Sequence, residues 1–370
     1  MPAAEFIFAV CQQGAEAALK AEVADQWPEF RFAFSRPGFV TFKLPNGHDL
    51  KGDFELRSTF ARAYGISLGK LQGDDPLSLA AGVWSLADEL EDVKHRFDNL
   101  HVWQRDATAS KKRGFEPTLT QLAQQTAQKI AEAGPQRPTT SPLRINRRAR
   151  AGQVVLDCVL VAPDQWWVGY HVATTVASQW PGGVPPIEPC DNMISRAYLK
   201  MHEALAWSQM PIEPGDCCVE IGCSPGGSAQ ALLEIGLDVA GIDPANVDEL
   251  VRVHPNFVHL KKRVADLRRR EFRGVKWLVS DSNVAPEFTL ESVESIVTYD
   301  DVHIRGLLLT IKLPNWDLAA QIPDYVERVR SWGFAHVRSR QLAFNRQEIC
   351  IAALRTKSMR RLSRKRPRRN

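Results

Sequence analysis

Five short apolar runs alternate with helical or irregular segments in the second half of the chain. They read DCCVEIG, LDVAGID, FVHLKKRV, KWLVSD and LLLTIKLP. Apolar strands separated by helical segments are typical of a doubly wound, mostly parallel sheet with helices on both faces. Two later runs, AHVRSRQLAF and QEICIAALR, are close enough in sequence to form an antiparallel hairpin at the sheet edge. The pattern predicts a Rossmann-like α/β domain over residues 179–355.

The first half of the chain predicts two smaller α+β units. The strand-like EFIFAVCQ, the helical GAEAALKAEVADQ and two strand-like runs joined by a Pro-Gly turn in RFAFSRPGFVTFKL make up residues 1–72. Residues 73–178 combine two helical segments with the strand NLHVWQRDA and a hairpin-like pair, QVVLDCVLV and QWWVGYHVA. The segment PGGVPPIEPC, rich in proline and glycine, predicts a linker into the α/β domain.

Length and composition exclude several classes of protein. With 370 residues, 44% of them hydrophobic, the chain can form two or three buried cores. No apolar run approaches 18 residues and the N-terminus has no basic segment. These features argue against a membrane span, a signal peptide or a membrane partner, and favour the cytoplasm. The seven cysteines are scattered without paired CxxC units, so we interpret them as reduced packing residues and expect no metal site.

Positive charge is concentrated near the C-terminus. The formal net charge is +4, but residues 357–370 alone hold eight lysines and arginines and no acid, so the rest of the chain sums to −4. We expect a disordered basic tail over 356–370, which either attracts a phosphate backbone or only improves solubility. The segment RINRRAR places four arginines in seven residues. The candidate residues for binding nucleic acid, all outside the α/β domain, are Arg144, Arg147, Arg148, Arg150, Arg361 and Arg364.

A glycine-rich turn follows the first strand of the α/β domain, in VEIGCSPGGSAQALL. Glycine lets the backbone approach a ligand closely, and Asp243 ends the next strand 21 residues after Gly222, where a ribose diol can be held. Together they indicate an adenosine-containing cofactor, although a tight strand-to-helix turn needs glycine for its geometry alone. The spacing is not GxGxxG, Pro225 removes a backbone donor and no lysine follows the glycines, which argues against NAD, ATP and GTP.

Four charged residues stand at comparable places around the predicted sheet edge. Lys200 lies in the helical SRAYLKMHEAL, Asp281 ends WLVSD, Lys312 lies in TIKLP and Glu348 opens QEICIAAL. A lysine in a partly desolvated site beside a second ammonium loses affinity for its proton and becomes a usable base. Any one of these residues could be an ordinary surface charge. Four of them around one pocket predict catalysis, such as removal of a proton from a sugar hydroxyl.

These residues resemble those of the FtsJ/RrmJ-type 2′-O-ribose RNA methyltransferases, which have a Lys-Asp-Lys-Glu tetrad and an S-adenosylmethionine site. The likeness covers residues 170–355 and is carried by SRAYLKMHEA, GCSPGGS, WLVSD followed by NVAP, IKLP, and RQL with RQEICIAAL. It implies that Lys312 is the general base, with Lys200, Asp281 and Glu348 as its electrostatic partners. The candidate cofactor-binding residues are Gly222, Cys223, Ser224, Pro225, Gly226, Gly227, Ser228, Asp243, Asp266 and Asp281.

The resemblance also implies a substrate and an organisation for the first half of the chain. The substrate would be RNA, a cytidine of large-subunit ribosomal RNA, and residues 1–72 and 73–178 would be a ferredoxin-like domain and a THUMP-like RNA-binding domain. For these two domains the support is their order and size, not a motif. The basic tail and Ser228, which stands where the family commonly has an aromatic residue, depart from the pattern.

Other functions stay open at this point. Asp266 could cap a helix instead of contacting adenine. The chain could be a catalytically silent RNA-binding protein, which the complete tetrad argues against. It could also methylate a base nitrogen, another RNA or a small molecule. Enzymes that methylate base amino groups usually place an Asn- or Asp-Pro-Pro-Tyr/Phe cluster after the fourth strand, whereas this chain has Asp281-Ser282-Asn283-Val284. The oligomeric state does not follow from the sequence.

Overall fold

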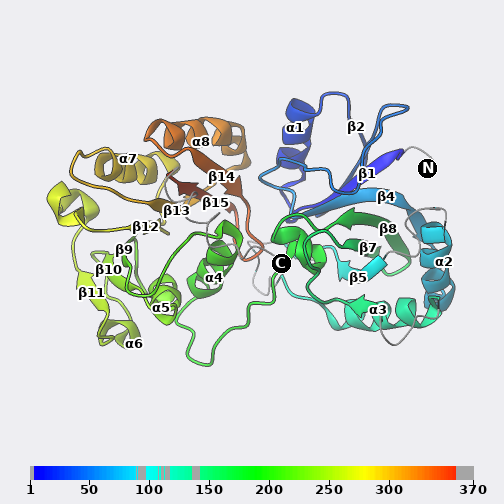
Figure 1. The fold of residues 1–370 in the computed structure, drawn as a ribbon, viewed down its shortest axis with the longest axis horizontal. Helices are drawn as coiled ribbons and strands as arrows, with labels where there is room; N and C mark the ends of the chain where they lie inside the picture. The colour runs from blue at the N-terminus through cyan, green and yellow to red at the C-terminus, as the bar shows by residue number, and fades with distance from the viewer. Residues whose placement is uncertain are drawn as a thin grey trace, which may run out of the picture. The chain divides into compact units, whose positions relative to one another are not determined.

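The chain forms two compact units, residues 1–186 and 187–370 (Figure 1). A computed structural model describes residues 4–88, 90, 97–106, 108–109, 112, 117–135 and 142–355. The expected basic tail, with Arg361 and Arg364, lies outside the described residues. Within the described ranges, no helix has both the length and the apolar character needed to cross a membrane.

The first unit is built on a mixed eight-stranded sheet in the spatial order β2-β3-β1-β4-β8-β7-β5-β6 (Figure 1). β5 pairs in parallel with β6 and β7, and the predicted hairpin of β7 and β8 is confirmed. The strands are β1 (Phe6–Val10), β2 (Arg31–Arg36), β3 (Phe39–Lys43), β4 (Ala63–Gln72), β5 (Phe97–Gln104), β6 (Arg144–Ile145), β7 (Val154–Ala162) and β8 (Gln165–Val172).

Three helices accompany this sheet: α1 (Glu16–Gln26), α2 (Pro76–Asp88) and α3 (Gln121–Ala133). α3 begins where the side chain of Thr120 accepts the backbone N–H of Ala123, and its buried Ala123, Ala127 and Ile130 recur at helical spacing. Trp84 of α2 donates to the carbonyl of Ile130, so the two helices are joined by a buried hydrogen bond of 2.6 Å as well as by apolar packing.

The sheet is continuous across the predicted domain boundary at residue 72. β4 ends at Gln72 and pairs with β1 on one side and with β8 on the other. The division into domains 1–72 and 73–178, and their ferredoxin-like and THUMP-like character, stay predictions.

The second unit is an open seven-stranded sheet in the order β11-β10-β9-β12-β13-β15-β14. The predicted parallel strands are confirmed, and 3₁₀ turns rather than a helix connect β11 to β12. The strands are β9 (Cys217–Ile221), β10 (Asp238–Ile242), β11 (Phe257–Leu260), β12 (Trp277–Ser280), β13 (Gly306–Lys312), β14 (His336–Arg340) and β15 (Glu348–Leu354). The helices are α4 (Ala197–Ser208), α5 (Gly227–Glu234), α6 (Glu249–Arg252), α7 (Pro286–Val297) and α8 (Ile322–Ser331).

The predicted antiparallel hairpin of the last two strands is confirmed, with the later strand on the inside. β15 pairs with both β13 and β14, and every one of its side chains is buried. β14 carries exposed residues such as His336 and Arg338. β15, which is apolar after its first residue, therefore takes the interior position, because a strand with polar side chains is better tolerated at the edge.

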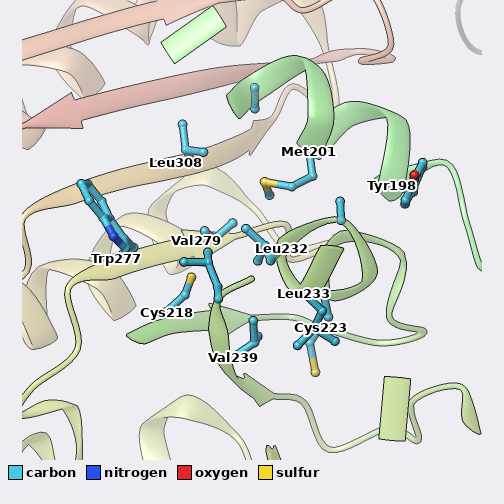
Figure 2. Packing of buried hydrophobic residues seen from close by; sticks show 14 of the residues in the cluster. Tyr198, Met201, Cys218, Cys223, Leu232, Leu233, Val239, Trp277, Val279 and Leu308 are labelled. Atoms are coloured by element: carbon cyan, nitrogen blue, oxygen red, sulfur yellow. The ribbon is translucent and has the colours of Figure 1, made fainter. Parts of the chain in front are cut away.

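A buried cluster fixes α4 and α5 against the sheet. Figure 2 shows Met201 of α4 and Leu232 of α5 close to Val279 of β12 and Leu308 of β13. Each of these side chains is at most 6% exposed, and burial of one such side chain is worth about 1.5–3 kcal/mol. The packing of Met201 sets the rotation of α4 and so holds the preceding residue, Lys200, in a fixed direction.

Candidate active site

The glycine-rich turn lies between β9 and α5, at the carboxyl end of the strand. Gly222 and Gly226 have φ values of +82° and +121°, a region of backbone conformation that favours glycine. Parallel strands present their carboxyl ends at one edge of the sheet, which is where such folds bind ligands. Of the candidate residues, Gly222, Cys223, Ser224, Pro225 and Gly226 form the turn, and Gly227 and Ser228 begin α5.

Two of the glycines are required by the packing of the turn itself. A Cβ on Gly222 would lie 2.5 Å from Ser282 Oγ, and a Cβ on Gly227 would lie 2.2 Å from Ser195 Oγ. Both distances are shorter than a Cβ can approach, so a larger residue would displace the segment after β12 or the segment before α4. At these two positions the need for glycine comes from the geometry of the fold.

Asp243 follows β10 and is held beside the turn. Its carboxylate accepts the backbone N–H of Ser224 at 3.2 Å and that of Ala245 at 2.8 Å. A carboxylate has about four acceptor positions, so on this half-exposed side chain two remain after those bonds. A ribose diol offers two hydroxyl donors, and the donor and acceptor set at this edge therefore fits an adenosine cofactor.

Glu220 in β9 is a buried acid that the sequence analysis did not single out. It lies two residues before Gly222 and is only 1% exposed. Burial, reinforced by the negative charges of Asp281 and Asp243, raises the pKa of Glu220 from 4.5 to about 8. The signal available in the sequence was an acid within an otherwise apolar strand. The charge on this side chain is thus sensitive to pH near neutrality.

The four charged candidate residues come from four elements of the second unit. Lys200 lies in the first turn of α4 and Asp281 directly follows β12. Lys312 ends β13 and faces Glu348, the first residue of β15, in the antiparallel register of the two strands. The order β12-β13-β15 therefore brings together residues that are far apart in sequence.

The four side chains form a closed set of ion pairs. Lys200 Nζ lies 2.6 Å from Asp281 Oδ2 and 3.1 Å from Glu348 Oε1. Lys312 Nζ lies 3.4 Å from Asp281 Oδ1 and also pairs with Glu348 Oε2. Each carboxylate thus contacts both ammonium groups, and the formal charges cancel. The side chains are 6–20% exposed, with Lys312 the most accessible of the four.

The pKa shifts in this cluster follow from its alternating charges. Burial alone would lower the pKa of Lys200, but the carboxylates of Asp281 and Glu348 outweigh it and raise that pKa above its ordinary value. Burial would raise the pKa of Asp281, and the two ammonium groups outweigh it and lower that pKa. Lys200 and Asp281 are therefore both held in their charged forms.

A second buried acid on α4 fastens the loop that leads into β15. Glu203 is 3% exposed, and its two carboxylate oxygens accept the backbone N–H groups of Ala343 at 2.8 Å and Phe344 at 2.9 Å. Arg196 also donates to the carbonyl of Phe344, at 3.3 Å. Lys200 and Glu203 lie one turn apart on the same helix, so α4 supports both Lys200 itself and the loop before Glu348. The sequence analysis missed this second role.

Asp266 lies away from the ion-pair cluster, at the end of the 3₁₀ turn Val264–Asp266. It is exposed, and its backbone N–H closes the turn on the carbonyl of Arg263. The alternative interpretation as a helix N-cap is wrong, because Asp266 ends a 3₁₀ turn and no helix starts there. β11 also stops at Leu260, earlier than the run FVHLKKRV indicated, since three consecutive charged residues follow.

The four candidate RNA-binding arginines of the first unit belong to one segment. Arg144 is in β6, and Arg147, Arg148 and Arg150 are exposed in the loop that follows. Arg148 Nε donates to Gln179 Oε1 at 2.8 Å, and its guanidinium lies 5.6 Å from the centre of the Trp180 ring. The side chain of Arg148 is therefore oriented by neighbouring groups, although it is exposed.

A buried polar cluster lies under this arginine segment. His171 Nδ1 is 2.6 Å from Asp157 Oδ2, and its Nε2 is 2.7 Å from the carbonyl of Ser178. His101 Nε2 is 2.9 Å from the carbonyl of Arg147, and burial, with the charge of His171, lowers the pKa of His101 to about 3. Each imidazole thus ties a loop to the sheet through a backbone carbonyl.

The fold and the site together define a class of protein. An open, mostly parallel sheet, a glycine-rich turn after β9 and an acid after β10 are the features of a Rossmann-like methyltransferase that uses S-adenosylmethionine. Residues 193–314 match the family model described as FtsJ-like methyltransferase. Over these residues the second unit is similar to FtsJ-like methyltransferases.

Two proteins that are similar to this chain have the same name. The chain is 25% identical over 365 residues to the ribosomal RNA large subunit methyltransferase M of Xanthomonas euvesicatoria, an alignment that covers 93% of this chain and 98% of the relative. It is 30% identical over 185 residues to the protein of the same name from Halorhodospira halophila, which covers 48% of this chain and 52% of that relative. The chain thus spans about half the length of one relative and nearly all of the other.

Proposed function

We propose that this protein transfers a methyl group to the 2′-hydroxyl of a ribose in RNA, and that the RNA is large-subunit ribosomal RNA with a cytidine as the target. The observation that carries the proposal is the cluster of two lysines and two carboxylates beside the glycine-rich turn. The relatives named as ribosomal RNA large subunit methyltransferases support the choice of RNA. With such a substrate, the enzyme would work in the cytoplasm.

In this proposal the methyl donor is held by the edge between β9 and β10. Asp243, oriented by two backbone N–H groups, binds the ribose hydroxyls of S-adenosylmethionine, and the backbone from Gly222 to Gly226 lies along its methionine part. Asp266 is assigned to the adenine amino group. The sulfonium supplies an activated methyl group and a good leaving group. The protein then has to align the acceptor oxygen and remove its proton, and alignment supplies most of the rate.

Proton removal is assigned to Lys312. Its side chain is the most exposed of the four, and its Nζ is oriented by Asp281 and Glu348. Lys200 stays charged, so when Lys312 is a neutral amine the cluster has a net charge of −1 instead of −2. A neutral amine within hydrogen-bond reach of the 2′-hydroxyl can accept its proton while the methyl group is transferred.

In the first unit, the arginine segment is assigned to RNA binding together with the basic tail. Arg147, Arg148 and Arg150 are exposed, and the buried His101 fixes their backbone through the carbonyl of Arg147. Phosphate contacts position an RNA without reading its sequence. The choice of nucleotide would then depend on other groups.

Ribose-methylation mapping tests the proposal. RNA from cells that lack this protein is compared with RNA from cells that carry either the wild-type protein or the Lys312→Ala variant. One ribose methyl group should appear with the wild type only, within large-subunit ribosomal RNA. A methyl group on a base, or the same ribose methyl group with Lys312→Ala, would overturn the assignment. Tight RNA binding without any methyl transfer would instead favour the catalytically silent alternative.

A further inference from the structure

The methyltransferase domain carries a strongly basic segment of its own, residues 261–273. It holds seven lysines and arginines against two acids, a formal charge of +5. The other residues between 187 and 355 hold 12 basic and 21 acidic side chains, a formal charge of −9. A domain with a net negative charge repels a phosphate backbone over most of its surface. Within residues 187–355, the basic segment is therefore opposite in charge to the rest.

Most cations of the basic segment are free to meet a ligand. Lys262, Arg263, Arg268 and Arg270 are exposed, and within the described ranges none of them has a hydrogen bond or ion pair through its side chain. Arg273, in the same segment, differs from them because it pairs with Asp301. The four unpaired cations are thus not explained by contacts within this unit.

The backbone of the basic segment is anchored although its charges are exposed. Leu267 and Phe272 are 5% and 2% exposed, so one side of the 3₁₀ turns packs into the domain while the cations stay outside. Leu267 N–H donates to the carbonyl of Val264, which closes the first turn. The segment therefore presents its cations from a fixed backbone, at a lower entropic cost than a flexible tail would have.

The segment begins at the edge of the sheet that holds the candidate active site. Lys261 directly follows β11, and β11 pairs in parallel with β10, which leads to Asp243. Lys261 Nζ donates to Asn246 Oδ1, 2.7 Å away, in the loop that follows Asp243. From β11 to β13 there are four strand spacings, or about 19 Å at roughly 4.8 Å each. At about 3.4 Å per stacked nucleotide, a strand that runs along this edge covers that span in roughly six nucleotides.

We propose that the basic segment 261–273 is a phosphate-binding surface for the RNA substrate, and that it grips the backbone roughly six nucleotides from the methylated ribose. The inference rests on the proposed function. It adds to the sequence-based expectation that RNA affinity lies mainly outside the α/β domain. Because phosphates carry no sequence information, the surface contributes to affinity and register, not to the choice of nucleotide.

The test is the salt dependence of RNA binding by the full chain with Lys262→Gln and Arg263→Gln together. Each lost phosphate contact on single-stranded RNA lowers the slope of log K against log salt by about 0.7, so this variant should lose about 1.4. Between 50 and 200 mM salt, the ratio of wild-type to variant affinity should therefore fall by about sevenfold. Arg268→Gln with Arg270→Gln should behave in the same way.

The matched control is Arg328→Gln with Arg330→Gln on α8, which removes two positive charges that already pair with Glu294 and Glu327. Its slope should equal that of the wild type. In the Lys262/Arg263 variant, KM for RNA should rise while the affinity for S-adenosylmethionine and kcat at saturating RNA stay unchanged. An unchanged slope with an active wild type would overturn this proposal alone, and would leave the segment as a solubilising surface or a contact for an acidic protein. A wild type that neither binds nor methylates RNA would overturn the proposed function itself.

Discussion

Glu203 offers the sharpest test of how the fold supports the ion-pair cluster. In the Glu203→Gln variant one oxygen is replaced by an NH₂ group, which meets the backbone N–H of Ala343 or Phe344 as a second donor. One charge-assisted hydrogen bond is lost and one buried N–H is left without an acceptor. Hydrogen bonds to charged groups are worth about 1.5–3 kcal/mol, so the free energy of unfolding should fall by about 2–3 kcal/mol.

The loss should also reach the active site, because the fastened loop leads directly to Glu348. Asn345 Nδ2 donates to the Glu348 carbonyl at 3.4 Å, and Arg346 N–H donates to Glu348 Oε1 at 3.3 Å. A displacement of about 1 Å at a reacting group can cost about 100-fold in rate. We therefore expect kcat of Glu203→Gln to fall by roughly 10- to 100-fold, while the dissociation constant of S-adenosylmethionine changes little.

The assay is single-turnover methyl transfer at a temperature where the variant is fully folded, with cofactor affinity measured by calorimetry. Glu327→Gln, at an exposed acid on α8, is the control and should be indistinguishable from the wild type. A variant that is destabilised but transfers methyl groups at the wild-type rate would refute the positioning role. A parallel loss of cofactor affinity would place the defect at the glycine-rich turn instead.

Four further results are expected. Lys312→Ala and Lys312→Arg should both lose methyl transfer and keep nearly full affinity for S-adenosylmethionine. The arginine variant should be inactive because guanidinium does not deprotonate in this pH range. Activity of either variant in a methyl-transfer assay would remove Lys312 from its role as the base. Asp243→Ala should bind S-adenosylmethionine roughly 10- to 100-fold more weakly in calorimetry, through the loss of about 1.5–3 kcal/mol; unchanged affinity would refute the assignment. Glu220→Gln should become more stable relative to the wild type as pH rises from about 4.5 to 8, because in this range the folded wild type retains a proton that its unfolded chain has released. Urea unfolding of both proteins across this pH range measures the difference in their free energies of unfolding. A difference that stays constant would contradict the raised pKa. A chain that ends at Arg355 should bind RNA more weakly at low salt with a shallower salt slope and methylate the same nucleotide; an identical slope would leave the tail as a solubilising appendage.

The fold of the second unit could be predicted from its pattern because most of its strands are separate apolar runs. The positions of Lys200, Asp281, Lys312 and Glu348 at strand and helix ends were also visible, since parallel strands share one carboxyl edge. The insertion of β15 between β13 and β14 was not, because sequence proximity favours a simple hairpin and only the burial of every side chain in β15 shows its interior place.

The supporting residues were harder to predict than the reactive ones. Glu203 and Glu220 lie within motifs that were read for other residues, and a buried acid cannot be distinguished from a surface acid until its partners are known. The continuity of the first sheet across residue 72 was missed for a similar reason. A strand that pairs on both sides, as β4 does, looks the same in sequence as one that ends a domain.

The place of β15 in the sheet determines the order in which parts of this chain can fold during synthesis. Glu348 follows β13 and β14 in the sequence, yet its strand lies in the interior of the sheet, between them. During synthesis, β13 and β14 therefore cannot reach their final arrangement until β15 has left the ribosome. Until it arrives, the edge of β13 is unpaired and both lysines of the cluster lack one of their two carboxylates. A nascent chain can fold its glycine-rich turn early, but it acquires the complete cluster only after β15 has been made.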